Sequence, residues 1–230
     1  MFKRKRLIVL GTAALVFGCL VIFVRQQYMF PIIMYHSILP EAPKGDVLVV
    51  SVDTFEKQMS FFKRHNYNVV TLSSVKDYIF KKKKIPSQAV ALTFDDGNKD
   101  NYTYAFPILK KYSFPATIFI IVSEVGAPGR LGWDEIKEMR DSGLITFGSH
   151  SFSHPFLDTI QSAEGLKKEI AGSKIALEEK LGGPVELFSY PCGRFNDVVV
   201  QAVKDAGYQE AVVTNPGKKI PNDNPLALKR

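Results

Sequence analysis

Residues 89–97 read Ala-Val-Ala-Leu-Thr-Phe-Asp-Asp-Gly, a short apolar run that ends in two carboxylates and a glycine. Six residues with almost no polar side chains, followed by a turn signal, predict a buried strand. The stretch therefore places an acidic pair where a central strand ends.

Segments with the patterns of strands and of amphipathic helices alternate on both sides of this run. Further strands are expected at residues 31–38, 116–121, 145–148, 185–190 and 211–214, and helices at 53–65, 75–82, 105–112, 133–142, 163–181 and 197–206. This alternation implies parallel strands joined by right-handed crossovers, and hence an α/β sheet or barrel. In such folds, functional sites form at the carboxyl ends of the strands.

Three of the four histidines also lie where an expected strand ends. His150 and His154 follow residues 145–148, and His36 lies within the first expected strand, near its end. Two imidazoles and one carboxylate form a metal site that keeps positions open for water and substrate. Of two adjacent aspartates, one could bind the metal while the other stays free as a base.

Each of these features by itself has a simpler explanation. An isolated Asp-Asp-Gly is commonly a turn, and an isolated His-x-x-x-His is commonly a surface pair or part of a core. His36 has the alternative of a buried structural histidine. Their occurrence together, in order and at strand ends, favours a catalytic metal site.

Two segments carry a resemblance to a known family. Residues 93–97, Thr-Phe-Asp-Asp-Gly, and residues 150–155, His-Ser-Phe-Ser-His-Pro, resemble motifs of the polysaccharide deacetylases, also called NodB-homology or carbohydrate esterase family 4 enzymes. The resemblance extends from about Pro31 to Arg230. It implies a distorted (β/α)7-type barrel that hydrolyses N-acetyl groups of a sugar polymer.

The resemblance also implies a role for each matching residue. Asp95 matches the family's catalytic base, and the metal ligands are matched by Asp96, His150 and His154. Ser151 matches the position whose hydroxyl supports the histidine loop. The implied cofactor is a divalent metal ion, zinc first, with cobalt, nickel or manganese as alternatives, because this ligand set does not choose among them.

The family's third motif, Arg-x-Pro-Tyr, falls on residues 189–192, Ser-Tyr-Pro-Cys, where only the proline matches. The backbone N–H of Cys192 is still expected to donate to the oxyanion, since that role requires no particular side chain. The missing arginine usually holds the catalytic aspartate. Arg194 is the nearby candidate to replace it.

The family's last motif, a hydrophobic residue, any residue and a histidine, has no match after Thr214 but matches residues 34–36, Met-Tyr-His. This order is similar to the circularly permuted branch of the family, which includes deacetylases of poly-N-acetylglucosamine. His36 is then expected to be the general acid that protonates the departing amine.

The charge of the chain is concentrated at its N-terminus. Residues 1–25 carry five positive and no negative charges, so only +2 of the net +7 belongs to the rest, which argues against a nucleic-acid partner. Residues 7–24 contain no charge, and as a helix they would span about 27 Å, close to the hydrocarbon thickness of a bilayer. The expected organisation is a cytoplasmic basic segment (1–6), a transmembrane signal anchor (7–24), a short linker (25–30) and an external deacetylase domain (31–230).

The sequence leaves two alternatives to a membrane anchor at the N-terminus, a cleaved signal peptide and lipidation. A cleaved signal peptide is less favoured, because no small-x-small site precedes Arg25. Lipidation at Cys19 is disfavoured by the large Phe17.

The expected function is the metal-dependent release of acetate from peptidoglycan or poly-N-acetylglucosamine at the outer face of the cytoplasmic membrane. Four aromatic residues near the site could stack on sugars or belong to the core: Trp133, Phe152, Phe156 and Tyr190. Two alternatives stay open, a non-catalytic sugar-binding module on the same fold and a hydrolase of a small amide or ester.

Overall fold

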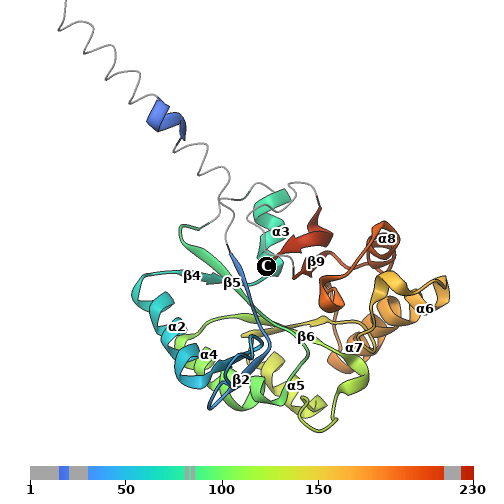
Figure 1. Cartoon of the computed structure of the whole chain (residues 1–230), viewed down its shortest axis with the longest axis horizontal. Coiled ribbons are helices and arrows are strands. Elements are labelled where there is room, and N and C mark those ends of the chain that lie inside the picture. The colour runs from blue at the N-terminus through green and yellow to red at the C-terminus, as the bar shows by residue number, and fades with distance from the viewer. Residues whose placement is uncertain (1–15, 21–30, 81–82, 84–85, 215–223) are drawn as a thin grey trace, which may run out of the picture.

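Eight strands form the central sheet, and all neighbours in it run parallel. Their order is β1–β5–β6–β7–β8–β9–β10, with β4 beside β5, and the sheet curves into a nearly closed barrel (Figure 1). The strands are β1 (Ile32–Tyr35), β4 (Asn68–Val70), β5 (Ala89–Phe94), β6 (Ala116–Ile120), β7 (Ile145–Ser149), β8 (Leu187–Ser189), β9 (Glu210–Val213) and β10 (Leu228–Lys229). The α/β barrel expected from the alternation is confirmed.

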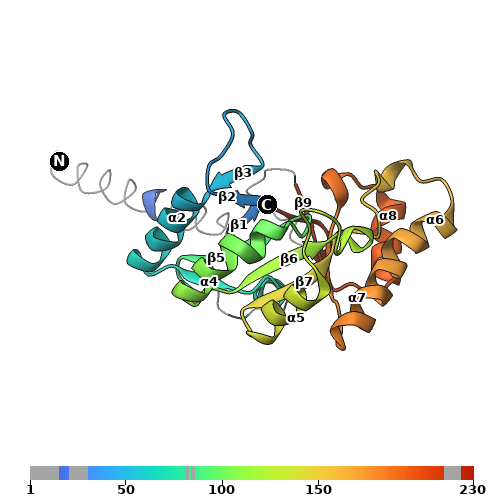
Figure 2. The ribbon, with the colours of Figure 1, turned by 90° about the horizontal axis from the view of Figure 1, so that it is seen from below.

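The computed structural model describes residues 16–20, 31–80, 83, 86–214 and 224–230. Helices surround the sheet (Figures 1 and 2). They are α2 (Val52–Arg64), α3 (Ser73–Phe80), α4 (Phe106–Tyr112), α5 (Trp133–Asp141), α6 (Ala163–Lys167), α7 (Ser173–Leu181) and α8 (Asp197–Asp205). A small second sheet pairs β2 (Ser37–Leu39) with β3 (Val49–Ser51).

The buried apolar residues form two layers. The smaller cluster takes one residue from each of six strands of the central sheet: Ile32, Ala91, Phe119, Leu187, Val212 and Leu228. Because side chains alternate between the faces of a strand, this cluster lies inside the barrel, and the larger cluster lies between the sheet and the helices. On β7 the interior position is Gly148, where a Cβ would lie 2.6 Å from the Phe119 ring.

The structure differs from the expected elements in three places. The expected strand at 31–38 is two strands in different sheets, because side chains bind its backbone near His36 and interrupt the ladder. The expected helix at 163–181 contains one π-helical turn, η4 (Lys168–Gly172). The short strands β3, β4 and β10 are not among the expected elements, since two or three residues give little periodic signal.

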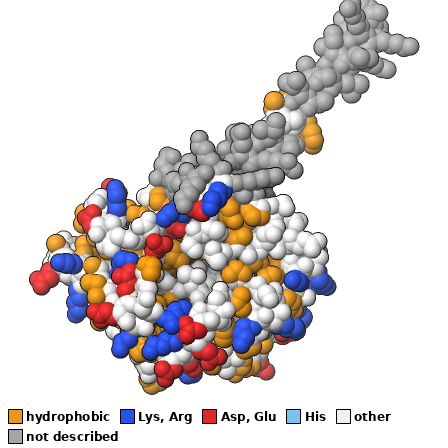
Figure 3. Space-filling view, turned by 180° about the vertical axis from the view of Figure 1, so that it is seen from behind, with side chains coloured by type: hydrophobic (Ala, Val, Ile, Leu, Met, Phe, Trp, Pro, Cys, Tyr) orange, Lys and Arg blue, Asp and Glu red, His pale blue; other side chains and the backbone are white. Residues whose placement is uncertain are grey.

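The expected transmembrane segment, 7–24, lies outside the described residues except for 16–20, which are helical. Among the helices that the structure describes, none has the length and apolar character needed to cross a bilayer. On the face of the domain shown in Figure 3, positive and negative side chains are interspersed. This mixed surface agrees with the small net charge of the chain beyond residue 25.

Candidate active site

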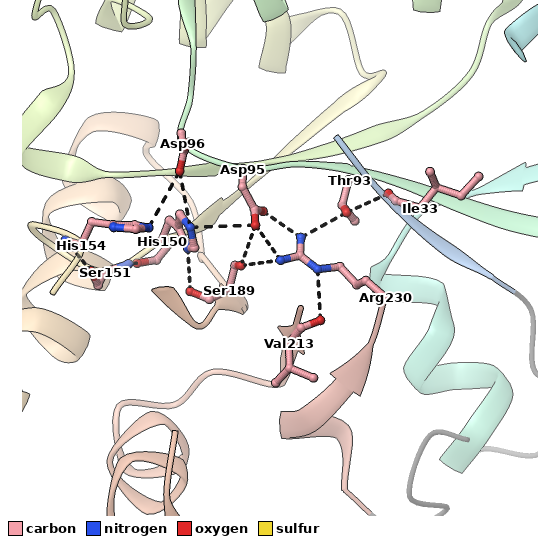
Figure 4. A network of polar contacts seen from close by, with 11 residues as sticks. Ile33, Thr93, Asp95, Asp96, His150, Ser151, His154, Ser189, Val213 and Arg230 are labelled. Atoms are coloured by element: carbon pink, nitrogen blue, oxygen red, sulfur yellow. Dashed lines mark hydrogen bonds and ion pairs between the residues drawn. The ribbon is translucent and has the colours of Figure 1, made fainter. Parts of the chain in front are cut away.

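Polar side chains gather where β5, β7, β8 and β10 end, because parallel strands bring their carboxyl ends to one side of the barrel (Figure 4). Asp95 and Asp96 follow β5, and His150 follows β7. Arg230 follows β10 and reaches the same centre. Asp95, Asp96 and His150 thus lie at the carboxyl ends of the strands, where the sequence predicts the site.

The two adjacent aspartates occupy different environments. Asp96 has a φ of 73°, in the left-handed region, so its side chain turns away from that of Asp95. The Asp95 side chain is 1% exposed, whereas that of Asp96 is 23% exposed and faces the histidines. Gly97 follows with a φ of 68°, and a Cβ there would lie 2.7 Å from the Ile120 side chain, which explains the glycine of the Asp-Asp-Gly motif.

Asp96, His150 and His154 each offer one ligand atom, and the three atoms lie within 4.8 Å of one another. The Nε2 atoms of His150 and His154 lie 3.6 and 3.9 Å from Asp96 Oδ1. Ligands about 2.1 Å from one tetrahedral ion would be about 3.4 Å apart, so these three groups fit a divalent metal ion after small shifts.

His150 is prepared to act as a neutral ligand. Its Nδ1 lies 2.8 Å from the Ser189 carbonyl, which leaves Nε2 facing Asp96. Burial lowers the pKa of the His150 imidazole, although the nearby Asp95 carboxylate opposes this shift. Neutral imidazole is the form that binds metal ions.

The loop between the two histidines is held by short polar contacts. Ser151 and His154 have φ values of 63° and 61°, so the backbone of the loop is in the left-handed region at both residues. The His154 N–H donates to Ser151 Oγ at 2.9 Å, which places Ser151 inside the loop, where its expected supporting role requires it.

A buried glutamate outside every motif also holds this loop. Glu169 accepts from Ser153 N at 2.8 Å and from Ser153 Oγ at 2.7 Å, and its own carbonyl accepts from Phe152 N at 3.0 Å. Glu169 lies in the π turn η4, a departure from regular helix that is common at functional sites. No sequence pattern identifies this glutamate, because residues 163–181 have the periodicity of an ordinary helix.

Arg230 makes the contact with Asp95 that was expected from an arginine in the third motif. Its guanidinium donates to Asp95 Oδ1 at 2.7 Å and to Oδ2 at 2.6 Å, and also to Ser189 Oγ at 2.9 Å. Arg194 was expected in this role, but it instead donates to Asp158 through Nε and Nη2. No local sequence pattern marks Arg230 for this role, because Lys229 separates it from the short apolar run that ends at Leu228.

The Arg230 pair decides the ionisation of Asp95. Burial would raise the pKa of this carboxyl, but the adjacent Arg230 guanidinium, together with His150 and His36, lowers it to about 2. Asp95 is therefore ionised at neutral pH despite being buried.

His36 follows β1 on the same side of the barrel, and its charge contributes to the low pKa of Asp95. Its carbonyl accepts from Asn101 Nδ2 at 2.8 Å. Asp100 accepts from the Ile38 N–H at 2.9 Å, so two side chains fix the backbone around His36. Asn101 also begins a π-helical turn, η1 (Asn101–Ala105), which precedes η4 in the described chain.

Cys192 lies on the short turn η5 (Pro191–Gly193), directly after β8 and its Ser189. Its φ of 52° is left-handed, and its side chain is exposed. Tyr190, before this turn, is fully buried and donates to the Leu226 carbonyl, so it belongs to the core. The structure thus places the backbone of Cys192 beside the strand that contacts both His150 and Asp95.

Comparisons with known proteins show which family the chain resembles. A family model described as polysaccharide deacetylase matches residues 82–211. YxkH of Bacillus subtilis strain 168 is 34% identical over 200 residues, which cover 87% of this chain and 70% of YxkH. The poly-beta-1,6-N-acetyl-D-glucosamine N-deacetylase of Staphylococcus aureus strain MRSA252 is 31% identical over 195 residues, covering 79% of this chain and 66% of that protein.

A solved structure is similar over almost the same range. The Streptococcus pyogenes deacetylase PplD in complex with acetate matches with a TM-score of 0.82 and 32% identity, over 87% of this chain and 90% of that one. The family model covers more than half of the chain, and YxkH is matched over more than two thirds of its length. The chain therefore belongs to the polysaccharide deacetylase family of hydrolases.

Proposed function

We propose that this chain removes N-acetyl groups from an N-acetylglucosamine-containing polysaccharide with the help of a divalent metal ion. The observation that carries the proposal is the convergence of the Asp96, His150 and His154 ligand atoms next to a second, buried carboxylate that Arg230 holds ionised. A module that only binds sugar would need no ionised base beside metal ligands.

We assign one residue of this chain to each step of amide hydrolysis. Asp96, His150 and His154 would hold a divalent ion, which when bound would supply Lewis acidity to the acetyl carbonyl and to the attacking water. Asp95 accepts the proton that this water loses. The Cys192 N–H donates a hydrogen bond to the oxygen on which negative charge develops. His36 protonates the nitrogen as the C–N bond breaks, which leaves acetate and a glucosamine unit.

Zinc is the proposed ion, with cobalt, nickel or manganese as alternatives. Two imidazole nitrogens and one carboxylate oxygen suit zinc in a site that keeps positions open for water and substrate. His150 supports this proposal, because its other nitrogen is fixed by the Ser189 carbonyl, as metal-binding histidines commonly are.

The proposed substrate is poly-N-acetylglucosamine or peptidoglycan. The Staphylococcus aureus relative is named for its action on poly-beta-1,6-N-acetyl-D-glucosamine, and PplD was solved with acetate, the acid that deacetylation releases. We further propose that residues 7–24 anchor the chain in the cytoplasmic membrane with its catalytic domain outside, because a basic segment precedes this uncharged run. Only six residues, 25–30, separate that run from the domain, so the enzyme would act close to the membrane.

The test is acetate release by the purified chain from N-acetylglucosamine oligomers and from peptidoglycan, after metal removal and after addition of zinc. We expect zinc-dependent release that Asp95→Ala lowers by at least about 10²-fold and that His36→Ala also lowers. A folded, zinc-loaded protein that binds the oligomers without releasing acetate would instead be a sugar-binding module. Release from small amides or esters alone would indicate a different hydrolase.

A further inference from the structure

One exposed aromatic side chain belongs to the loop that carries the candidate metal ligand His154. Of the four aromatics that could stack on sugars, Tyr190 is buried, Trp133 and Phe152 are half-buried, and Phe156 is 48% exposed. Phe156 follows the ligand His154 by two residues, so their Cα atoms are at most about 7 Å apart. The backbone of Phe156 is therefore close to that of a candidate metal ligand.

Arg194 fixes the position of this ring. Its guanidinium carbon lies 4.7 Å from the centre of the Phe156 ring, within the range of a cation–π contact. Arg194 is held in turn by Asp158, to which Nε and Nη2 donate at 3.1 and 2.9 Å. Since the guanidinium already covers part of the ring and Phe156 is still 48% exposed, the rest of the ring is open to solvent.

The pair joins two loops of the candidate site. Phe156 continues the loop that carries His154, and Arg194 follows the turn that carries Cys192. A molecule resting on the pair would therefore lie beside the metal ligands on one side and the proposed oxyanion donor on the other. In the described part of the chain, Arg194 Nη1 has no hydrogen-bond partner, so its two N–H groups remain available.

The exposed ring and the free donors match the chemistry of a pyranose. A sugar ring has a face of C–H groups that packs against an aromatic ring, and it has hydroxyls at its edge that accept hydrogen bonds. A single exposed phenylalanine needs no explanation by itself. Here the ring contacts a guanidinium that is paired with a carboxylate, so the ring and the guanidinium are already partly ordered before a ligand binds.

We propose that Phe156 and Arg194 form a binding subsite for the sugar ring next to the one that loses its acetyl group, with Asp158 as the residue that positions Arg194. The subsite makes the enzyme prefer polymer over single sugars, and this part of the inference rests on the proposed function. Phe156 contributes contact area, and Arg194 contributes orientation through its free N–H groups.

The test compares Phe156→Ala with Phe61→Ala, which removes a phenylalanine of similar exposure, 43%, from α2. For an N-acetylglucosamine pentamer, we expect Phe156→Ala to raise KM about five- to tenfold with kcat within twofold, and to leave the KM for the single sugar unchanged. Phe156→Trp is expected to restore the KM, and Arg194→Lys to raise it about threefold. Phe61→Ala is expected to behave as the wild type.

Two direct binding measurements keep the inference separate from the proposed function. Calorimetric titration with the pentamer reports sugar binding even if the wild type releases no acetate, and titration with zinc alone reports whether the histidine loop is intact. Weaker pentamer binding in Phe156→Ala but not in Phe61→Ala, at unchanged zinc affinity, supports the subsite. Pentamer binding equal to the wild type, or an equal loss of zinc affinity, would overturn it.

Discussion

Asp95 and Glu210 are both about 1% exposed, yet they lie at opposite ends of the barrel and in opposite electrostatic states. Asp95 follows the carboxyl end of β5, where Arg230 lowers its pKa to about 2. Glu210 begins β9 at the amino end, where burial raises its pKa to about 8, and its Oε2 has no hydrogen-bond partner within the described residues. Burial alone favours the neutral acid at both ends, so the difference is due to the positive partners of Asp95, of which the Arg230 guanidinium has the largest effect.

Glu169, a third buried carboxylate, supports the same contrast. It lies near the carboxyl ends of the strands, and both of its oxygens accept hydrogen bonds from Ser153. At the other end, the charges that influence Glu210 are mixed, with Lys76 favouring its ionised form and the Glu186 and Asp77 carboxylates opposing it. The two buried carboxylates near the metal ligands thus have partners for both of their oxygens, whereas Glu210 has an oxygen without a partner among the described residues.

The largest effect is expected from breaking the Arg230 pair. Arg230→Met leaves Asp95 buried without its partner, so we expect acetate release to fall by at least about 10²-fold and the free energy of unfolding to fall by about 3–5 kcal/mol. In the wild type the low pKa of Asp95 stabilises the fold at pH values above its usual 3.8, and this contribution is lost as the pH falls towards about 2. In the variant the pKa of Asp95 rises, so the acid limb of the activity profile moves to higher pH.

The control for stability is Arg194→Met, because Arg194 makes the same two-pronged contact with Asp158 in an exposed position. Its effect on the free energy of unfolding is expected to stay below about 1 kcal/mol, by urea denaturation. Arg230→Lys keeps one charge but loses the fork, and we expect an activity loss of about tenfold. If Arg230→Met retained the wild-type pH profile, the guanidinium would not be what keeps Asp95 ionised.

A smaller effect is expected from changing Glu169, the buried carboxylate that holds the histidine loop. Glu169→Gln replaces one accepting oxygen by an NH2 group that faces a Ser153 donor, while the size of the side chain is kept. We expect the affinity for zinc to fall about tenfold, as is usual when a residue that supports a metal ligand is changed. Competition with a chelator measures it, and Glu164→Gln on the neighbouring exposed surface is the control. Unchanged affinity in Glu169→Gln would mean that the loop is held without this carboxylate.

Much of this site could be predicted because its residues lie in short local motifs. Asp95 and Asp96 follow a strand that reads clearly from its apolar run, and His150 and His154 are four residues apart after another. These patterns depend on chain neighbours, which the sequence displays directly. The barrel was predictable for the same reason, since strand and helix periodicities alternate along most of the domain.

The missed residues depend on contacts between distant segments. Arg230 lies 135 residues from Asp95, and β10, the strand before it, contains only Leu228 and Lys229. No feature of the neighbouring sequence favours Arg230 over Arg194 as the partner of Asp95. Arg194 is closer in sequence to the third motif, but in the structure it pairs with Asp158. The break after β1 was missed similarly, because the Asn101 side chain that binds the His36 carbonyl lies 65 residues away.

The smallest effect on activity concerns the amino end of the barrel. Because the pKa of Glu210 is raised from 4.5 to about 8 in the folded state, the native fold loses stability as the pH rises from about 4.5 towards 8. Glu210→Gln removes the ionisable group, so we expect it to be close to the wild type at pH 4.5 and to be more stable at pH 8.5, by at most about 4 kcal/mol. Urea denaturation at the two pH values measures this, with the exposed Glu179→Gln as control. Acetate release should not change, because this carboxylate lies at the end of the barrel away from the metal ligands. An equal shift at both pH values would show that Glu210 is ionised in the fold and that its lack of a guanidinium partner does not set its state.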